Sequence, residues 1–374
     1  MKPSAKIILD SITEQGHRLV TMEVVMHRFV LAEMNTHRAF SRNSASSRAI
    51  PFKKIFDRVD NSPALPWYWG KEQKGMQSGE ELLATEQMAC QGIWEEASKD
   101  ALSKAWALHT IGVHKSLVNR LLEPFMWHTA IISATEWDNF FWQRCDPDAQ
   151  PEMKAVADEM QRAYYTSIPK QLVHGQWHMP YIQDRDWDDA RQILTGDNTV
   201  MVSPTMYELT DMLKKVSVAR CARVSYLTHD GERSLETDIG LFEKLSVKLH
   251  PSPFEHVAKP IVVPQGYETQ GSGSQGWSGN FHGWHQFRKD LPNENRQNFV
   301  PNLPDLMREY IIASPHGSAR VEVPVGTVPS VTGKVGGGTY TLTSIKGTVA
   351  RVTRPIKWDT PQDEVKKIME EYDL

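Results

Sequence analysis

The spacing of hydrophobic positions changes twice within the first fifty residues. Residues 6–10 and 19–26 are rich in β-branched and apolar side chains, which predicts two β-strands. From Arg28 to Met34 the apolar positions take helical spacing, and the polar residues 37–48 follow directly. We therefore expect a short helix that ends in a polar loop, a place where binding sites often lie.

The pattern over the middle of the chain is mainly helical. Residues 80–109 are predicted as a long amphipathic helix with Met88, Ile93 and Ala105 on or near one stripe. Helices are also expected within 136–165 and over 235–249. The intervening residues are expected to form a loop (51–79), a crossing rich in proline and aspartate (166–197) and a Gly/Ser-rich loop (266–279).

The sequence changes character after Pro315. β-Branched and polar residues alternate on both sides of Gly336-Gly337-Gly338, which predicts a β-hairpin. Residues 361–372 have the pattern of a charged amphipathic helix. We expect a main domain over 1–315 and a β-rich extension over 316–374.

Composition excludes several classes of protein. The chain has 374 residues and a net charge of −4, whereas general nucleic-acid binders usually carry a basic excess, so we expect no nucleic-acid partner. No apolar run approaches the roughly 18 residues that a membrane span needs, and Met1-Lys2-Pro3-Ser4 is too polar for a signal peptide. Three cysteines without CxxC spacing fit a reducing compartment, so we expect a cytoplasmic protein with no membrane contact. Its histidines show no HExxH or His-x-His set, and no metal is expected.

The polar segment 37–48 has the composition of an anion-binding loop. It contains three arginines, one histidine and five hydroxyl or amide side chains. Guanidinium groups bind phosphate oxygens at two points, and serine hydroxyls with backbone N–H groups supply further donors. The alternative for a segment of this composition is a solvated connection with no ligand. The order of its residues favours the first interpretation.

Within this segment, His37-Arg38-x-x-Ser41-x-Asn43-x-x-Ser46-x-Arg48 resembles the signature of flavin-dependent thymidylate synthases. Thr36 stands where that family has arginine. A second hallmark of the family, Ala-Arg-Val-Ser followed by a helix and a His-x-Ser-Pro-Phe-Glu-His run, is matched by residues 222–225 and 250–256. Taken alone, the latter histidines could merely flank a proline turn.

A third set of matches lies between these two hallmarks. Arg120, Asn139, Arg144, Gln150 and Glu152 match family positions. Other positions depart from the pattern: Asn119, Glu123 and Asp148 replace the residues that the family has there. In the family the Pro-Phe-Glu-His run precedes the signature, whereas here it follows by about two hundred residues, so we interpret the chain as circularly permuted or rearranged.

The resemblance implies an α+β fold of mixed helices and antiparallel sheet in a permuted order, with motifs at 36–48, 119–153 and 219–257 in the catalytic domain. A strand over 19–26 should then lie beside 219–225 or 257–263. It also implies roles for individual residues. The nucleotide would be bound by Glu33, Ser44, Ser46, Arg48, Arg120 and Arg144, with Ser46, Arg120 and Arg144 also serving catalysis. FAD would be contacted by His37, Arg38, Asn43, Asn139, Ser225, His250, Ser252 and Glu255.

The activity that this resemblance implies is the reductive methylation of dUMP to dTMP. Carbon comes from methylenetetrahydrofolate, electrons pass from NADPH through FAD, and the assembly is a homotetramer or another homo-oligomer such as a dimer. Thr36 and Glu33 both remove positive character, so hydroxymethylation, or modification of another pyrimidine nucleotide, is an alternative. A nucleotide-binding homologue without catalysis is a third. The basic, aromatic segment 279–296 is either a decayed second copy of the signature or an unrelated substrate loop.

Overall fold

The computed structural model describes residues 1–195, 203–226, 234–248, 250–261, 276–292 and 294, together with five strands beyond residue 309. The chain forms two compact units, Met1–Glu294 and Asn295–Leu374. The division expected from the sequence, at residue 315, stays a prediction. The expected loop 266–279 lies mostly outside the described residues, and the expected helix 361–372 lies wholly outside them.

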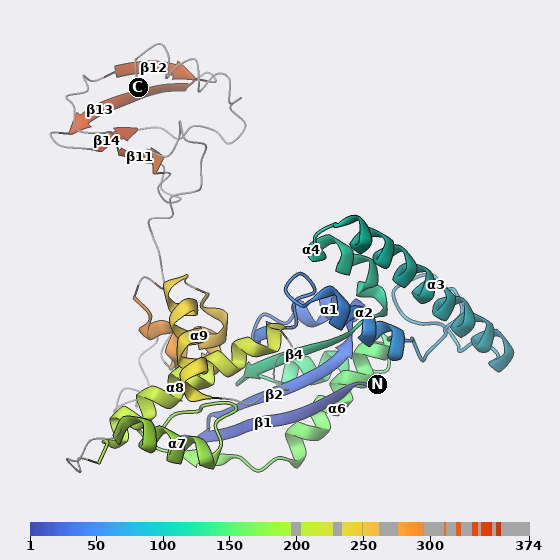
Figure 1. Ribbon diagram of the computed structural model, residues 1–374, viewed down its shortest axis with the longest axis horizontal. Helices are drawn as coiled ribbons and strands as arrows, with labels where there is room; N and C mark the ends of the chain where they lie inside the picture. The colour runs from blue at the N-terminus through green and yellow to red at the C-terminus, as the bar shows by residue number, and fades with distance from the viewer. Residues whose placement is uncertain are drawn as a thin grey trace. The chain divides into compact units, whose positions relative to one another are not determined.

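A five-stranded sheet forms the centre of the first unit, with the strand order β3-β4-β2-β1-β5 (Figure 1). The first four of these strands pair antiparallel, and β5 runs parallel to β1. Gly16, at φ +88°, closes the turn between β1 and β2. The two predicted N-terminal strands are thus confirmed. The strands are β1 (Ser4–Thr13), β2 (Arg18–His27), β3 (Ser41–Ser44), β4 (Trp127–Ala134) and β5 (Lys170–Leu172).

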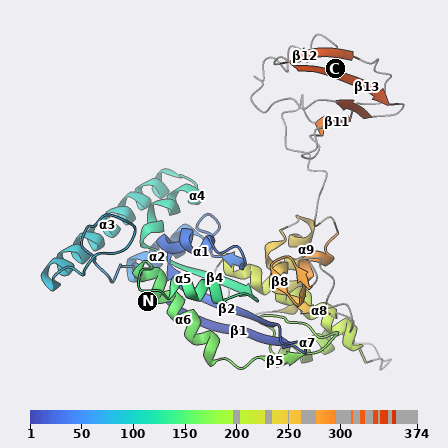
Figure 2. The same ribbon diagram turned by 180° about the vertical axis from the view of Figure 1, so that it is seen from behind.

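Two helices cover one face of this sheet. They are α5 (Asp138–Arg144) and α6 (Pro151–Thr166) (Figure 2), which confirm the helices predicted within 136–165, with α6 ending one residue later. Met22 and Ile132 on neighbouring strands pack against Trp137 and Phe140 there, all at most 2% exposed. Burial of this apolar surface is the main stabilising contribution to the unit.

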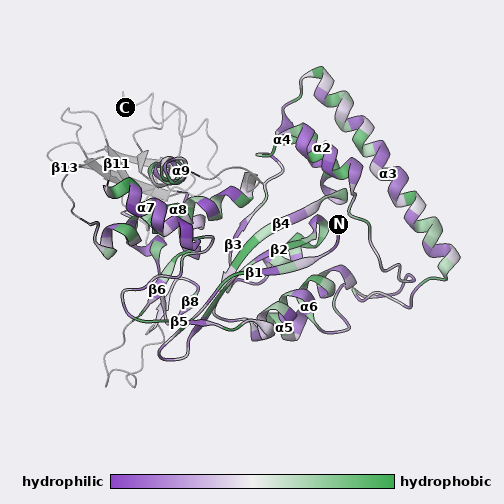
Figure 3. Cartoon of the chain, turned by 60° about the horizontal axis from the view of Figure 1, so that its bottom comes forward, coloured by the Kyte–Doolittle hydropathy of each residue, from purple (hydrophilic) through white to green (hydrophobic). Residues whose placement is uncertain are grey.

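The helices at one end of the sheet agree only in part with those predicted from the sequence. The predicted short helix appears as η1 (Arg28–Val30) and α1 (Leu31–Asn35). Residues 51–79 are not a continuous loop, because α2 (Phe52–Asn61) buries an i, i+3, i+7 set of apolar residues there. The long helix is confirmed as α3 (Ala84–Ile111), but Met88 and Ile93 are exposed, and Figure 3 shows hydrophobic and hydrophilic residues along its whole length. Short helices α4 (Lys115–Val118) and η2 (Asn119–Phe125) lead into β4.

The second half of this unit packs on the opposite face of the sheet. Ile131, which alternates with the residues facing α5 and α6, contacts Cys221 and Val224. Residues 166–197 were expected to cross between the two halves of the unit without a helix, but they contain α7, so this prediction was wrong. The helix expected over 235–249 is confirmed as α9. The elements are α7 (Asp184–Thr195), α8 (Met206–Arg223), η3 (Val224–Tyr226), α9 (Leu235–Val247), η4 (Ser252–His256), β6 (Ala258–Pro260), β7 (Trp277–Ser278), β8 (Phe281–His282), β9 (Trp284–Gln286) and η5 (Phe287–Asp290).

Strand pairing differs from the expectation for residues 19–26. β2 pairs with β1 and β4, while residues 219–225 are helical and β6 pairs with β9. β2 thus pairs with neither expected segment, but it lies beside the second of them, because Leu19 of β2 and Ala258 of β6 belong to one buried hydrophobic cluster. The contact between these parts is made by side chains on the face of the sheet.

The second unit contains a five-stranded antiparallel sheet in the order β10-β11-β14-β13-β12. The antiparallel pairing of β12 with β13 confirms the predicted β-hairpin. The strands are β10 (Tyr310–Ile311), β11 (Ala319–Glu322), β12 (Val331–Val335), β13 (Gly338–Ile345) and β14 (Val349–Val352). Helices and antiparallel strands together confirm the α+β class. Among the helices described, none has the length and apolar content needed to cross a bilayer.

Candidate functional site

The signature segment forms an edge strand where the sequence suggested a loop. Ser41–Ser44 make up β3, which pairs with β4 on one side only. Ser41 and Asn43 are buried, whereas Arg42 and Ser44 are partly exposed, the alternation that a strand imposes. β3 also packs against η3 and η4. The two family hallmarks, far apart in sequence, therefore lie together.

Direct hydrogen bonds join the signature to the Ala219–Ser225 segment. The side-chain amide of Asn43 donates to the carbonyl of Cys221 at 3.4 Å, across 178 residues of sequence. The backbone N–H of Ser46 donates to the carbonyl of Ser225 at 3.0 Å. Asn43, Ser46 and Ser225, all expected at the site, therefore lie close together.

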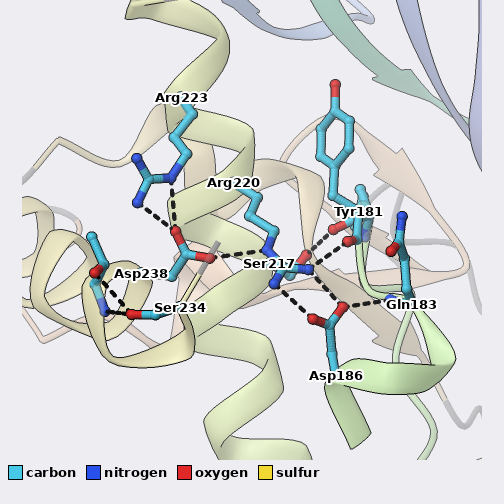
Figure 4. Close-up of polar contacts among 10 residues, drawn as sticks. Tyr181, Gln183, Asp186, Ser217, Arg220, Arg223, Ser234 and Asp238 are labelled. Atoms are coloured by element: carbon cyan, nitrogen blue, oxygen red, sulfur yellow. Dashed lines mark hydrogen bonds and ion pairs between the residues drawn. The ribbon is translucent and has the colours of Figure 1, made fainter. Parts of the chain in front are cut away.

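A buried ion cluster holds the C-terminal end of α8, which leads directly into η3 and Ser225 (Figure 4). Arg220, only 1% exposed, donates two hydrogen bonds to Asp186 of α7, at 2.6 and 2.7 Å, and one to Asp238 of α9, at 2.9 Å. Arg223 donates to the other oxygen of Asp238 at 2.7 Å. Two-point pairing of this kind offsets the cost of burying the charges. The cluster therefore fixes where α8 ends.

Arg144 reaches the start of the signature from α5. Its Nε donates to Nε2 of His37 at 2.9 Å, and its Nη2 donates to the Thr36 hydroxyl at 3.1 Å. Burial, and then the charges of Arg144 and Arg42, lower the pKa of His37 to about 4. His37 is therefore neutral at neutral pH, with its proton on Nδ1 and Nε2 accepting. Thr36, the position that departs from the family signature, takes part in this contact.

Glu123 and Asn119, two other positions that depart from the family pattern, hydrogen-bond Ser47 near the end of the signature. Glu123 accepts from Arg120 at 2.7 Å, from Arg28 at 3.2 Å and from the Ser47 hydroxyl at 2.5 Å. Asn119 donates from its amide to the carbonyl of Ser47 at 2.6 Å. Arg120, expected to bind the nucleotide, is thus paired with a carboxylate, and its side chain is 52% exposed.

Among the residues that the structure describes, the remaining expected residues form no compact group of contacts. His250 and Ser252 are exposed before and at the start of η4, and Asn139 is exposed on α5, where it accepts from Gln143. Glu33 is partly buried on α1. Arg38 and Arg48 are exposed. Within the described ranges neither these two guanidiniums nor Arg144 has a carboxylate partner, which leaves them able to bind an anion.

Glu255, in the second hallmark, is held by two residues that belong to neither family motif. Its carboxylate pairs with Arg288 of η5, and its carbonyl accepts from the amide of Gln286 at 3.3 Å. Burial lowers the pKa of Arg42 of β3, and the charge of Glu255 acts in the opposite direction. Both new residues come from the segment 279–296, whose basic and aromatic composition was the available signal.

A chain of buried polar groups connects η4 to the sheet. His256 Nδ1 lies 2.8 Å from the Ser133 hydroxyl, which lies 2.6 Å from that of Thr21, and Thr21 lies 2.8 Å from His178 Nε2. Nδ1 of His178 completes the chain at 2.9 Å from Ser11. Burial lowers the pKa of both histidines to about 3, so both are neutral. This series of polar contacts connects the second hallmark to β2.

Comparison with known families agrees with the first part of this picture. Residues 10–170 match the family described as thymidylate synthase complementing protein. The resemblance drawn from the sequence motifs is thereby confirmed over the part of the chain that carries the His37–Arg48 signature and the Arg120–Glu152 matches. The Ala219–Val257 hallmark lies beyond the matched residues, and the rearranged order stays a prediction.

Solved structures include a UMP/dUMP methylase, PolB from Streptomyces cacaoi, that is similar to part of this chain. Its structure with 5-Br UMP gives a TM-score of 0.36 at 12% identity, over 44% of this chain and 88% of that chain. Its structure with 5-Br dUMP gives 0.36 at 13% identity, over 44% and 90%. A search of curated proteins found no match.

Proposed function

We propose that this chain is a flavin-dependent enzyme of the thymidylate synthase type, which methylates dUMP to dTMP with methylenetetrahydrofolate as carbon donor and NADPH as electron donor. The observation that carries the proposal is the meeting of the two hallmarks, through the Asn43–Cys221 and Ser46–Ser225 hydrogen bonds, in a chain whose residues 10–170 match the family.

The residues present fit an anionic dinucleotide and a nucleotide monophosphate. Arg38, Arg48 and Arg144 are guanidiniums without a carboxylate partner among the described residues, and phosphates are the anions that such groups bind best. FAD would be held by the residues of β3, η3, η4 and α5 assigned to it above. When bound, it supplies the reducing equivalents that the reaction takes from NADPH.

The nucleotide would be activated by charge and not by a protein nucleophile. Guanidiniums placed at the pyrimidine carbonyls stabilise the negative charge that makes C5 nucleophilic. Burial raises the pKa of the Cys145 thiol to about 11 and also raises that of Cys221, which is fully buried. Neither is therefore a ready thiolate.

Thr36 supports a second candidate function. It replaces a guanidinium of the family signature and hydrogen-bonds Arg144, so the charge at the substrate differs from the family pattern. The second candidate is therefore hydroxymethylation of dUMP or modification of another pyrimidine monophosphate.

The test uses purified protein, FAD, NADPH, methylenetetrahydrofolate and each pyrimidine monophosphate in turn, with mass analysis of the products. We expect a flavin absorption spectrum and a stabilisation of about 2.7 kcal/mol at a hundredfold excess of FAD over its Kd. A methylated product identifies the first candidate and a hydroxymethylated one the second. A protein that gives neither a flavin spectrum nor thermal stabilisation would contradict both.

A further inference from the structure

Residues 276–288 contact both family hallmarks at once, although the proposed function assigns them no role. The Gln286 side chain, 2% exposed, donates to the Ser41 hydroxyl of β3 at 3.2 Å and to the Glu255 carbonyl of η4 at 3.3 Å. Two residues further on, Arg288 pairs with the Glu255 carboxylate. One short segment thus holds the signature strand and the Pro-Phe-Glu-His run in place.

We propose that Gln286 and Arg288 are positioning residues that fix β3 and η4 relative to each other, so that both present their side chains to one flavin. The inference rests on the proposed function for the identity of the ligand. The positioning itself rests on the contacts alone.

The surroundings of Gln286 are built to hold its side chain in one place. Gly279 has φ +60°, and a Cβ there would lie 2.0 Å from Oε1 of Gln286, so only glycine leaves room for the amide. The Ser278 hydroxyl accepts from the backbone N–H of Gln286 at 3.2 Å, and Asn280 donates to the same Ser41 hydroxyl at 3.4 Å. The β7–β8 turn therefore closes over the Gln286–Ser41 contact.

Arg288 supplies the charge that Glu255 needs. The Glu255 side chain is 14% exposed, and a partly buried carboxylate without its partner would favour a rearrangement of η4. Lys289, next to Arg288, pairs with Glu294 at 2.9 Å and makes no contact with either hallmark among the residues described. It is a matched control on the same helical turn.

The test compares Gln286→Met, Arg288→Met, Arg288→Lys and Lys289→Met with the unmodified full-length protein. Hydrogen exchange without FAD is measured for amides in residues 41–46 and 252–257, and FAD affinity by quenching of flavin fluorescence. Gln286→Met removes the hydrogen bonds to Ser41 and to the Glu255 carbonyl, and Arg288→Met removes the ion pairs with Glu255 and Glu294. We therefore expect both variants to raise exchange and to weaken FAD binding, each by about tenfold. Arg288→Lys should recover most of the affinity, and Lys289→Met should match the unmodified protein.

Each readout can overturn the inference separately from the proposed function. Unchanged exchange in the two methionine variants would show that the contacts do not hold the hallmarks. Raised exchange with an unchanged FAD Kd would show a structural role without positioning. If the unmodified protein binds no FAD, the proposed function fails and so does the flavin part of the inference, while exchange still decides whether the two segments are held together.

Discussion

At the scale of the residue, the contacts of Arg144 depend on the geometry of its guanidinium group. It spans from α5 to the signature by donating from two different nitrogens, to His37 and to Thr36. A lysine has the same charge, but its three N–H donors share one nitrogen, so it lacks the separate, coplanar nitrogens with which Arg144 reaches His37 and Thr36. The exchange of arginine for lysine therefore tests geometry separately from charge.

We expect Arg144→Lys to reduce nucleotide binding or turnover by about 2–4 kcal/mol with little change in the free energy of unfolding. Titration calorimetry with dUMP and steady-state kinetics measure the loss. Arg191→Lys, whose side chain pairs with Asp188 on the surface of α7, is the control and should leave both unchanged. Full activity of Arg144→Lys would exclude the assigned role.

At the scale of elements, buried charge and buried neutral imidazoles join the helical half of the unit to the sheet. The Arg220 cluster ties α7, α8 and α9 together, and the His178–His256 chain ties η4 to β2 and β4. The cluster depends on complete pairing, whereas the chain depends on both histidines staying neutral.

Asp238→Asn should lower the free energy of unfolding by about 3 kcal/mol, because it leaves Arg220 and Arg223 without their shared carboxylate in a buried place. Urea denaturation followed by circular dichroism measures the change. Asp188→Asn removes an exposed ion pair and should cost less than about 1 kcal/mol. Equal losses in the two variants would mean that the buried cluster does not stabilise the packing of these helices.

Acid should destabilise the protein through His178 and His256. Well above pH 6.5, the ordinary pKa of histidine, both imidazoles are neutral in the folded and the unfolded chain. Between pH 6.5 and about 3, the unfolded chain binds a proton on each that the folded chain does not, because burial lowers their pKa to about 3. The free energy of unfolding should therefore fall with falling pH, by up to about 1.4 kcal/mol per pH unit for each histidine.

His178→Gln should make this pH dependence shallower, whatever it costs at neutral pH. Urea denaturation at several values between pH 5 and pH 7 gives the slope for each variant. His174→Gln, at an exposed position, should keep the slope of the unmodified protein. An unchanged slope in His178→Gln would mean that His178 does not stay neutral in the folded state.

At the scale of the whole molecule, the two hallmarks and the segment that holds them all belong to the first unit, which ends at Glu294. Every contact invoked above lies within that unit. The second unit has its own five-stranded sheet. Flavin binding should therefore depend on the first unit alone.

A chain ending at Glu294 should fold and bind FAD with a Kd within about threefold of the value for the 374-residue chain, since a compact domain with its own core can fold alone. Flavin fluorescence and circular dichroism test this, and size-exclusion chromatography shows whether assembly changes. Loss of flavin binding in a folded truncated chain would assign the second unit a direct part in the site.

The sequence by itself determined the elements whose signals are local. β1, β2, α3, α9 and the β12–β13 hairpin follow from spacing and turn residues within each segment. The signature and the hallmark residues were also identifiable from their order alone. The apolar spacing of α2 was equally local, but the prolines and tryptophans that follow it favoured a loop.

Only the tertiary structure decided how these pieces meet. β3 consists of polar residues that become a strand because β4, more than eighty residues later, supplies the hydrogen bonds. The neighbours of β2 and the contacts of Gln286 and Arg288 likewise depend on segments distant in sequence. Such pairings have no local signature, because they are selected by the burial of surfaces that exist only once the chain has folded.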